Sequence, residues 1–261
     1  MPIIDSHVHL FTSDHLPHLA WASPSSPLYS SHSVDEYLSE IPPAIRGDFG
    51  GFLFVETDRR YTEVSPDGDA SALAQAWKWP IEEVNFVCQV AARNEGLVKG
   101  ILPWAPMNLG PAAVERFWGL LDLEQRGVEG LLKGFRYLLQ DKPQGTILRR
   151  EFMESMDWLW QNGFVFEVGV DVRSGGLWQM EEALEAIGKV SRGPGKNGSA
   201  FVISTSTDPC AVFLFLAALT DKTIWANPIY TSRPPNYLPT RHSNPGSLSS
   251  PVSPRCTPPF S

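Results

Sequence analysis

Two histidines, His7 and His9, close the first apolar run of the chain, and Asp5 precedes them. Alternate residues of a strand point to the same face, so this spacing predicts three side chains on one face. Two imidazoles on one face can share a divalent cation such as zinc, which lowers the pKa of a water molecule toward 7 and makes a hydroxide nucleophile available. The alternative is a pair of partly buried histidines that form only hydrogen bonds. Their position at the end of a first strand favours the metal site.

Short apolar runs rich in Val, Ile, Leu and Phe alternate along the chain with longer amphipathic stretches. This alternation is typical of βαβ units with a parallel sheet. The predicted strands cover residues 2–10, 51–56, 97–104, 128–136, 164–170 and 200–204. The predicted helices cover residues 33–41, 80–94, 111–125, 149–162 and 176–190.

From the third predicted strand onward, strands begin at residues 97, 128, 164 and 200. A spacing of roughly 30 to 36 residues matches one strand plus one helix of a (β/α)8 barrel, a fold of about 250 residues. Active sites of such barrels lie at the carboxyl ends of the strands, where the two histidines are expected. We therefore predict an α/β fold over residues 1–220, an incomplete TIM-like (β/α)8 barrel of about six βα units.

The end of the chain has a different composition. Residues 228–261 contain nine prolines and seven serines, which cannot supply a packed core. We predict that residues 221–261 form a disordered tail outside the barrel. The apolar stretch at 210–219 lies between barrel and tail, and we expect a short helix there.

Composition excludes several classes of function. A net charge of −8 without a cluster of Lys and Arg argues against nucleic acid or an anionic membrane as a partner. No apolar run reaches the roughly 18 residues of a membrane span, and Met1 leads directly into a strand-like run rather than a leader. Cys88, Cys210 and Cys256 lack CxxC spacing, which argues against a disulfide framework and a cysteine-type zinc site. These features predict a cytoplasmic protein, and they leave its oligomeric state open.

The first strand, residues 3–10, resembles the opening strand of the amidohydrolase-related branch of the amidohydrolase superfamily. Further segments resemble those of fungal L-rhamnono-γ-lactonases, so that the resemblance runs from residue 1 to about 203. These segments are residues 19–21, 32–38, 54–59, 103–106, 133–143 and 169–176. The resemblance implies hydrolysis of a small-molecule sugar-acid lactone to the aldonic acid on a distorted TIM-like barrel. It also implies a divalent metal, with zinc expected, in many but not all relatives.

Within that resemblance, two charged residues at strand ends become candidate catalytic groups. Glu56 ends the second strand and is expected to bind lactone hydroxyls or help hold a metal; the alternative is a surface ion pair with Arg59 or Arg60. Arg136 ends the fourth strand and is expected to hold the lactone carbonyl or the product carboxylate through its planar fork. The alternative for Arg136 is a structural salt bridge, and Lys133 is a weaker candidate for the same role.

Four further residues are candidates for substrate binding. Trp104 and Tyr137 are expected to form an apolar wall for a sugar ring, although packing in the core is the commoner fate of aromatic residues. Asp171 and Arg173 follow the fifth strand, where they either form a polar rim of the pocket or cap the next helix. Three other histidines lack ligand spacing and are expected to be solvated or locally bonded: His15, His18 and His32.

Two features of the family are missing. The sixth strand of the family resembles apolar-apolar-Asp-His-Leu-Gly-Lys-Pro, whereas residues 201–209 read Phe-Val-Ile-Ser-Thr-Ser-Thr-Asp-Pro, without a histidine. The family also carries an Asp on its eighth strand that resembles a general base or metal ligand, and this chain has no predicted eighth strand. His242 lies in the Pro/Ser-rich stretch, so it is not assigned to the lost role.

A change of reading frame would explain this departure. With one choice of codons for residues 203–210, the frame two bases later encodes Gln-His-Leu-Asp-Gly-Pro-Leu, which restores a histidine followed four residues later by proline. We hypothesise that the chain from about Ser204 is translated out of frame. An uninterrupted frame in the transcript, together with a peptide from residues 221–261 in mass spectrometry, would refute this.

The sequence thus predicts a lactonase of the amidohydrolase-related family whose activity depends on replacements for the missing His and Asp. Two alternatives stay open. One is a catalytically inactive, truncated or frameshifted fragment. The other is a metal-dependent decarboxylase of the same branch, against which the lactonase-like segments around Arg136 and Gly175 argue.

Overall fold

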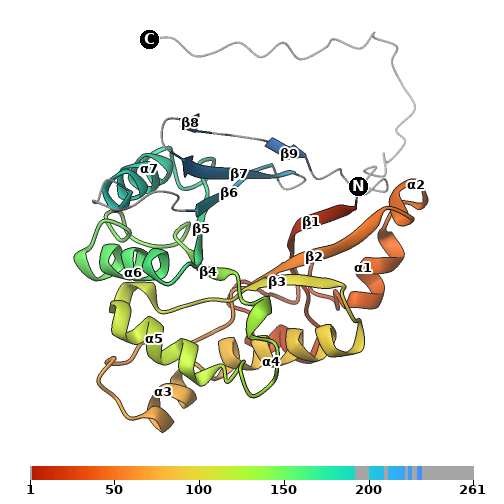
Figure 1. Ribbon diagram of the computed structural model, residues 1–261, viewed down its shortest axis with the longest axis horizontal. Coiled ribbons are helices and arrows are strands. Elements are labelled where there is room, and N and C mark those ends of the chain that lie inside the picture. Colours follow the sequence, from red (N-terminus) through yellow and green to blue (C-terminus); the bar gives the residue numbers. More distant parts are fainter. Residues whose placement is uncertain (1, 192–199, 209–210, 221–222, 225–227, 231–261) are drawn as a thin grey trace, which may run out of the picture.

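The computed structural model describes residues 2–191, 200–208, 211–220, 223–224 and 228–230 (Figure 1). All six predicted strands are present. The strands are β1 Ile3–Val8, β2 Phe49–Val55, β3 Val98–Leu102, β4 Gly134–Leu138, β5 Val165–Val170, β6 Ala200–Asp208, β7 Ala211–Thr220, β8 Thr223–Ile224 and β9 Pro228–Tyr230.

Helices follow each of the first five strands, as predicted, and lie outside the strands in Figure 1. The helices are α1 Val34–Glu40, α2 Pro43–Arg46, α3 Ala70–Ala76, α4 Lys78–Arg93, α5 Pro111–Leu120, α6 Arg150–Gln161 and α7 Trp178–Val190. The sequence analysis does not predict α2 and α3, which are too short to show a helical period. None of the helices in the described ranges is long and apolar enough to cross a membrane.

The first six strands run parallel in chain order, in two sheets. The first sheet has the order β1-β2-β3, and the second begins with β4-β5-β6. Between β3 and β4, the described residues form two isolated parallel bridges, Ile101 to Leu132 and Trp104 to Arg136. A β-strand, helix, β-strand order with parallel pairing is the arrangement predicted from the alternating sequence pattern.

After β6 the alternation stops, and the expected short helix at 210–219 is wrong. β7 pairs with β6 in antiparallel register, with Phe201 opposite Ala217 and Ile203 opposite Phe215. A short continuous apolar run does not distinguish helix from strand by periodicity, and pairing with the free edge of β6 satisfies the main chain. Of the predicted tail 221–261, only β8 and β9 are described, and the rest lies outside the described residues.

The predicted fourth strand, 128–136, starts too early. Residues Glu129–Leu131 form a 3-10 turn, and β4 begins at Gly134. Val128, Leu131 and Leu132 all pack on the core, so the apolar character that suggested a strand comes from burial alone. A Cβ at Gly134 would lie 1.9 Å from the carbonyl oxygen of Val165, so the start of β4 requires glycine.

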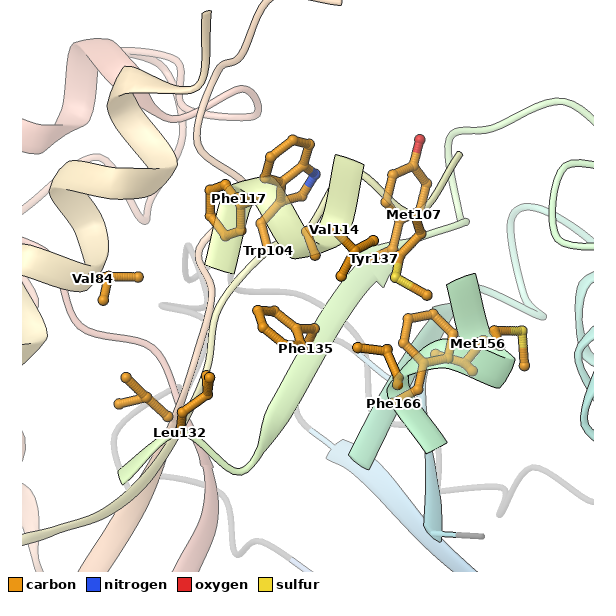
Figure 2. Packing of buried hydrophobic residues seen from close by; sticks show 14 of the residues in the cluster. Val84, Trp104, Met107, Val114, Phe117, Leu132, Phe135, Tyr137, Met156 and Phe166 are labelled. Atoms are coloured by element: carbon orange, nitrogen blue, oxygen red, sulfur yellow. The ribbon is translucent and has the colours of Figure 1, made fainter. Parts of the chain in front are cut away.

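One large hydrophobic core joins both sheets and the surrounding helices. Figure 2 shows its centre, where Phe135 of β4 lies among Leu132, Val114 and Trp104 on one side and Phe166 of β5 on the other. Phe135 and Phe166 are completely or almost completely buried. Because burial of a large aromatic side chain contributes about 1.5–3 kcal/mol, this core fixes β4 and β5 against their helices and against β3.

Candidate functional site

A cavity of about 480 Å³ opens at the carboxyl ends of β1, β2 and β4, where parallel strands place ligand sites. Its polar lining is formed by His9, His32, Glu56, Thr57, Asp58, Arg136 and Gln140. Its apolar lining is formed by Phe11, Trp21, Leu28 and Leu138. The cavity therefore combines a few convergent polar groups with apolar walls, as small-molecule sites do.

The rings of His7 and His9 contact each other through their Nε2 atoms. The two Nε2 atoms are 3.0 Å apart, while His9 Nδ1 lies 3.0 Å from the carbonyl oxygen of Val55. A carbonyl only accepts, so His9 Nδ1 carries the proton and its Nε2 presents a lone pair. His7 Nδ1 lies 3.3 Å from a carboxylate oxygen of Glu167, which favours the same tautomer. Two lone pairs at this distance repel unless a cation or a proton lies with them.

A proton is not favoured at this position. Burial and the nearby Arg136 guanidinium lower the pKa of His7 to about 3. The pKa of His9 is lowered as well, first by its depth in the protein and then by His7 and Arg136. His9 lines the open cavity, where water screens part of this effect. Both rings are neutral near pH 7, so the pair fits a metal cation, for which neutral imidazole is the usual ligand.

The remaining charges of the site lie on Glu56, Arg136 and Glu167. Arg136 Nη1 is 3.2 Å from Glu56 Oε1, and Arg136 Nε is 3.1 Å from Glu167 Oε1. Arg136 and Glu167 stand opposite each other in the register of β4 and β5. The alternative predicted for Glu56, a pair with Arg59, is not formed, because Arg59 pairs with Glu83. Arg136 forms these salt bridges and also lines the cavity, and its predicted role in binding the lactone carbonyl stays a prediction.

This cluster contains more negative than positive charge. One guanidinium faces two buried carboxylates, and both histidines are neutral. Burial raises the pKa of Glu56 to about 8, although Arg136 opposes this shift. Either a proton on Glu56 or a cation at the histidines compensates the excess. Among the described residues, no group of three or more His, Cys, Asp and Glu side chains is placed to hold a metal. The metal site at His7 and His9 stays a prediction.

Added zinc is expected to stabilise the folded protein through this pair. At a zinc concentration of about 100 times the dissociation constant, binding contributes about 2.7 kcal/mol, which raises the melting temperature by about 5 °C or more. A thermal unfolding scan with and without zinc measures the shift. The His7→Ala, His9→Ala double variant should lose it. His18→Ala should keep it, because His18 stacks on Trp79 instead. An equal shift in the double variant would show that zinc binds elsewhere.

Trp104 and Tyr137, the predicted apolar wall, lie in the core and do not line the cavity. Trp104 is 4% exposed and packs against Tyr61 and Phe117. Tyr137 is 2% exposed and packs edge-on against Phe152. Figure 2 shows both side chains among the apolar residues of the cluster. This corrects their predicted position: large aromatic side chains next to buried strands gain more by packing than by facing solvent.

Asp171 and Arg173 are also outside the cavity lining. The Asp171 carboxylate accepts hydrogen bonds from the backbone N–H groups of Arg173 and Ser174, and its own N–H donates to Gln179 of α7. The Asp171 carboxylate thus closes a turn that precedes α7. It does not cap that helix, whose N-cap is Leu177, so neither the predicted rim nor the predicted cap is found. The short side chain of Asp closes such turns by accepting hydrogen bonds from backbone N–H groups that follow it in the chain.

Glu167 is a site residue that the sequence analysis missed. It occupies the middle of β5, is 1% exposed, and contacts both His7 and Arg136. A single carboxylate within the apolar strand Val-Phe-Glu-Val-Gly-Val was the available signal, because a buried charge requires a partner.

Phe11, Trp21, His32 and Asp58 line the cavity without having been predicted there. They come from the loop after β1 and from the turn after β2. These segments have no periodic sequence pattern from which the direction of a side chain could be predicted. His32 lines the cavity, and its ring is locally bonded as predicted, with Nε2 3.4 Å from Ser30 Oγ. Its main chain pairs with Phe11. The lining aromatics Phe11 and Trp21 occupy the place expected for Trp104 and Tyr137.

The structural likeness concerns the fold. An amidohydrolase from Burkholderia multivorans, solved with bound HEPES, superimposes with a TM-score of 0.50 at 19% identity, covering 73% of this chain and 54% of that chain. A second structure of an amidohydrolase from the same organism, with bound zinc, has a TM-score of 0.44 at 15% identity, covering 78% of this chain and 69% of that chain. The first likeness supports the α/β fold with parallel strands.

No protein-family model matches the chain. The chain is 35% identical over 242 residues to L-rhamnono-γ-lactonase of Scheffersomyces stipitis, across 88% of this chain. It spans 66% of the length of that relative, just under two thirds. Over the matched region the chain is thus similar to this lactonase, and its fold is similar to that of an amidohydrolase.

Proposed function

We propose that this protein hydrolyses a sugar-acid lactone of the L-rhamnono-γ-lactone type to the open aldonic acid. The observation that carries the proposal is the convergence of His9, Glu56 and Arg136 at one cavity, with the Nε2 atom of His7 3.0 Å from that of His9, in a chain 35% identical to a lactonase. The substrate is a small molecule. We further propose that β1 to β6 correspond to the first six units of a TIM-like barrel, and that the protein acts in the cytoplasm.

His7 and His9 would hold a divalent cation, with zinc as the proposed metal. When bound, such a cation supplies Lewis-acid polarisation and lowers the pKa of water. Glu167, at His7 Nδ1, and the Val55 carbonyl, at His9 Nδ1, orient the two rings. Partners of this kind fix the tautomer and the direction of metal-binding histidines.

Arg136 is placed to stabilise the charge that develops in the reaction. Attack of water on the lactone carbonyl forms a carbon–oxygen bond and moves negative charge onto the carbonyl oxygen, which the guanidinium can bind. The ring carbon–oxygen bond then breaks, and the leaving oxygen takes a proton. Glu56, with a pKa raised to about 8, can accept the proton from water and return it to that oxygen, because its pKa lies near the operating pH.

Lactone hydrolysis followed by pH-stat on L-rhamnono-γ-lactone, with and without zinc, tests this proposal. The wild-type chain should release acid, and the His7→Ala, His9→Ala double variant should lose at least about 100-fold in kcat/KM, because one oriented polarising group contributes about 2.7–4 kcal/mol. His18→Ala serves as the matched control and should keep its activity. Absence of acid release by folded, zinc-loaded wild type would refute the proposal.

A second candidate is an inactive protein that only binds lactones. It is favoured by the absence of histidine from residues 201–209, where the family pattern has one. Under this candidate the cavity binds L-rhamnono-γ-lactone in calorimetry without acid release in the pH-stat. Decarboxylation of an aromatic acid is the remaining alternative, and carbon dioxide release from such acids would support it.

A further inference from the structure

Asp58 adopts a backbone conformation that side chains rarely take. Its φ is 58°, in the left-handed region, where Asp is tolerated but strained. It directly follows the β2 strand end that carries Glu56, and it lines the cavity. Strained residues persist where the surrounding structure holds them, and they cluster at ligand sites.

The main chain around Asp58 is held on both sides. Its N–H donates to the Glu56 carboxylate, and its carbonyl accepts from the Ala20 N–H at 2.8 Å. The adjacent Arg60 N–H donates to the carbonyl of His18 at 2.8 Å, and Leu19 bridges to Arg59. The strained conformation is thus fixed by a strip of antiparallel contacts with residues 18–20.

The carboxylate of Asp58 has no comparable partner. Across the residues that the structure describes, no N–H or O–H group donates a hydrogen bond to it. It is half-buried, and the charges that act on it are Asp141, Lys142, Arg136 and Arg60. Burial and Asp141 raise the pKa of Asp58, and the three basic groups lower it. An acceptor held at a cavity wall without a protein donor is free to accept hydrogen bonds from ligand hydroxyls.

Trp21 is fixed to the same turn. Its indole N–H donates to the carbonyl of Thr57 at 2.9 Å, and its ring meets Phe11 edge-on with centroids 5.7 Å apart. Trp21 lines the cavity and remains 39% exposed. The apolar ring of Trp21 and the free carboxylate of Asp58 are therefore both held at the turn that contains Thr57 and Asp58.

We infer that Asp58 and Trp21 form a specificity subsite, in which Asp58 accepts hydrogen bonds from ring hydroxyls and Trp21 covers the carbon face of the same ring. This inference rests on the proposed lactone hydrolysis and adds the residues that select hydroxylated lactones over unsubstituted ones. Sugar rings suit this pair because they present hydroxyl edges and C–H faces at the same time. Asp58 is a binding residue here, and the proton transfers remain with Glu56.

The test compares L-rhamnono-γ-lactone with γ-valerolactone, which has no ring hydroxyl. Asp58→Gly removes the carboxylate and suits the left-handed backbone, so the fold is retained. The ratio of kcat/KM for the hydroxylated lactone to that for γ-valerolactone should fall about 10-fold or more, through KM, as expected for a lost hydrogen bond to a charged group. Asp58→Asn keeps one acceptor oxygen and should give an intermediate ratio.

Asp122→Gly is the matched control. Asp122 has a φ of 51° and lies outside this cavity, so the variant makes the same chemical change at a remote left-handed position. It should leave the ratio unchanged. Trp21→Ala should raise KM for the hydroxylated lactone. An unchanged ratio in Asp58→Gly would overturn the inference, and so would an equal loss of activity on both lactones.

Calorimetric titration with the same two lactones separates this inference from the proposed function. If wild type hydrolyses neither lactone but binds L-rhamnono-γ-lactone more tightly, and Asp58→Gly loses that preference, the subsite stands and the proposed function fails. If wild type hydrolyses L-rhamnono-γ-lactone and Asp58→Gly binds both lactones as wild type does, the proposed function stands and the subsite fails.

Discussion

Arg136→Met is expected to lower kcat/KM for L-rhamnono-γ-lactone by about 10²- to 10³-fold. Loss of one group that stabilises a developing oxyanion costs about 2.7–4 kcal/mol, and Arg136 is the cation of the cavity wall that contacts both Glu56 and Glu167. With methionine at this position, the carboxylates of Glu56 and Glu167 face each other without a cation between them. Their negative charge then repels the product carboxylate. Steady-state kinetics by pH-stat on zinc-loaded protein measure the change.

Lys133→Ala is the control for Arg136→Met. Lys133 lies one residue before β4, is exposed, and donates to the carbonyl of Gly130, so its removal should not change kcat/KM. Arg136→Lys restores the charge without the planar fork and should recover part of the activity. Full activity in Arg136→Met, measured on folded protein, would assign Arg136 a structural salt bridge only.

Arg59→Met is expected to lower the free energy of unfolding by about 3–5 kcal/mol, the cost of breaking a buried ion pair from one side. Arg59 is 2% exposed, and its Nε lies 3.2 Å from Glu83 Oε1. Glu83, on α4, also accepts hydrogen bonds from the N–H and hydroxyl groups of Thr57. Without Arg59, the negative charge of the Glu83 carboxylate is buried without a positively charged partner. Urea unfolding followed by circular dichroism gives the difference.

Two comparisons test the cause of that loss. Lys78→Ala breaks the exposed pair of Lys78 and Glu82 on the same helix, 3.8 Å apart, and should change the free energy of unfolding by less than about 1 kcal/mol. Removing both buried partners, in Arg59→Met with Glu83→Leu, should recover much of the loss, because no unpaired charge remains. A double variant as unstable as Arg59→Met alone would show that lost packing, not lost charge pairing, is responsible.

The strands of this fold were predictable because each buried strand is a short apolar run between helical stretches. The strand boundaries were less predictable where residues are buried without being paired in a sheet. Val128 and Leu131 are apolar because they pack on the core, yet the ladder begins only at Gly134. The β7 strand was predicted as a helix because its apolar run has no period, and its antiparallel pairing with β6 is visible only in the structure.

The site was predictable at strand ends and unpredictable in loops. His7, His9, Glu56 and Arg136 follow from alternation along strands and from charges at strand ends, and the structure brings them together. Asp58 acquires its position from a left-handed turn that main-chain contacts with a distant loop hold in place, and no local pattern in the sequence encodes such contacts.

The parallel strands form two sheets, and each sheet contributes some of the residues of the site. His7, His9 and Glu56 belong to the sheet that begins the chain, whereas Arg136 and Glu167 belong to the other, and isolated bridges join the two. The Arg136–Glu56 and His7–Glu167 contacts therefore also link the two sheets. By thermodynamic linkage, a ligand that strengthens these contacts also resists separation of the sheets. Under the proposed function, ligand binding and the cohesion of the two sheets are therefore coupled.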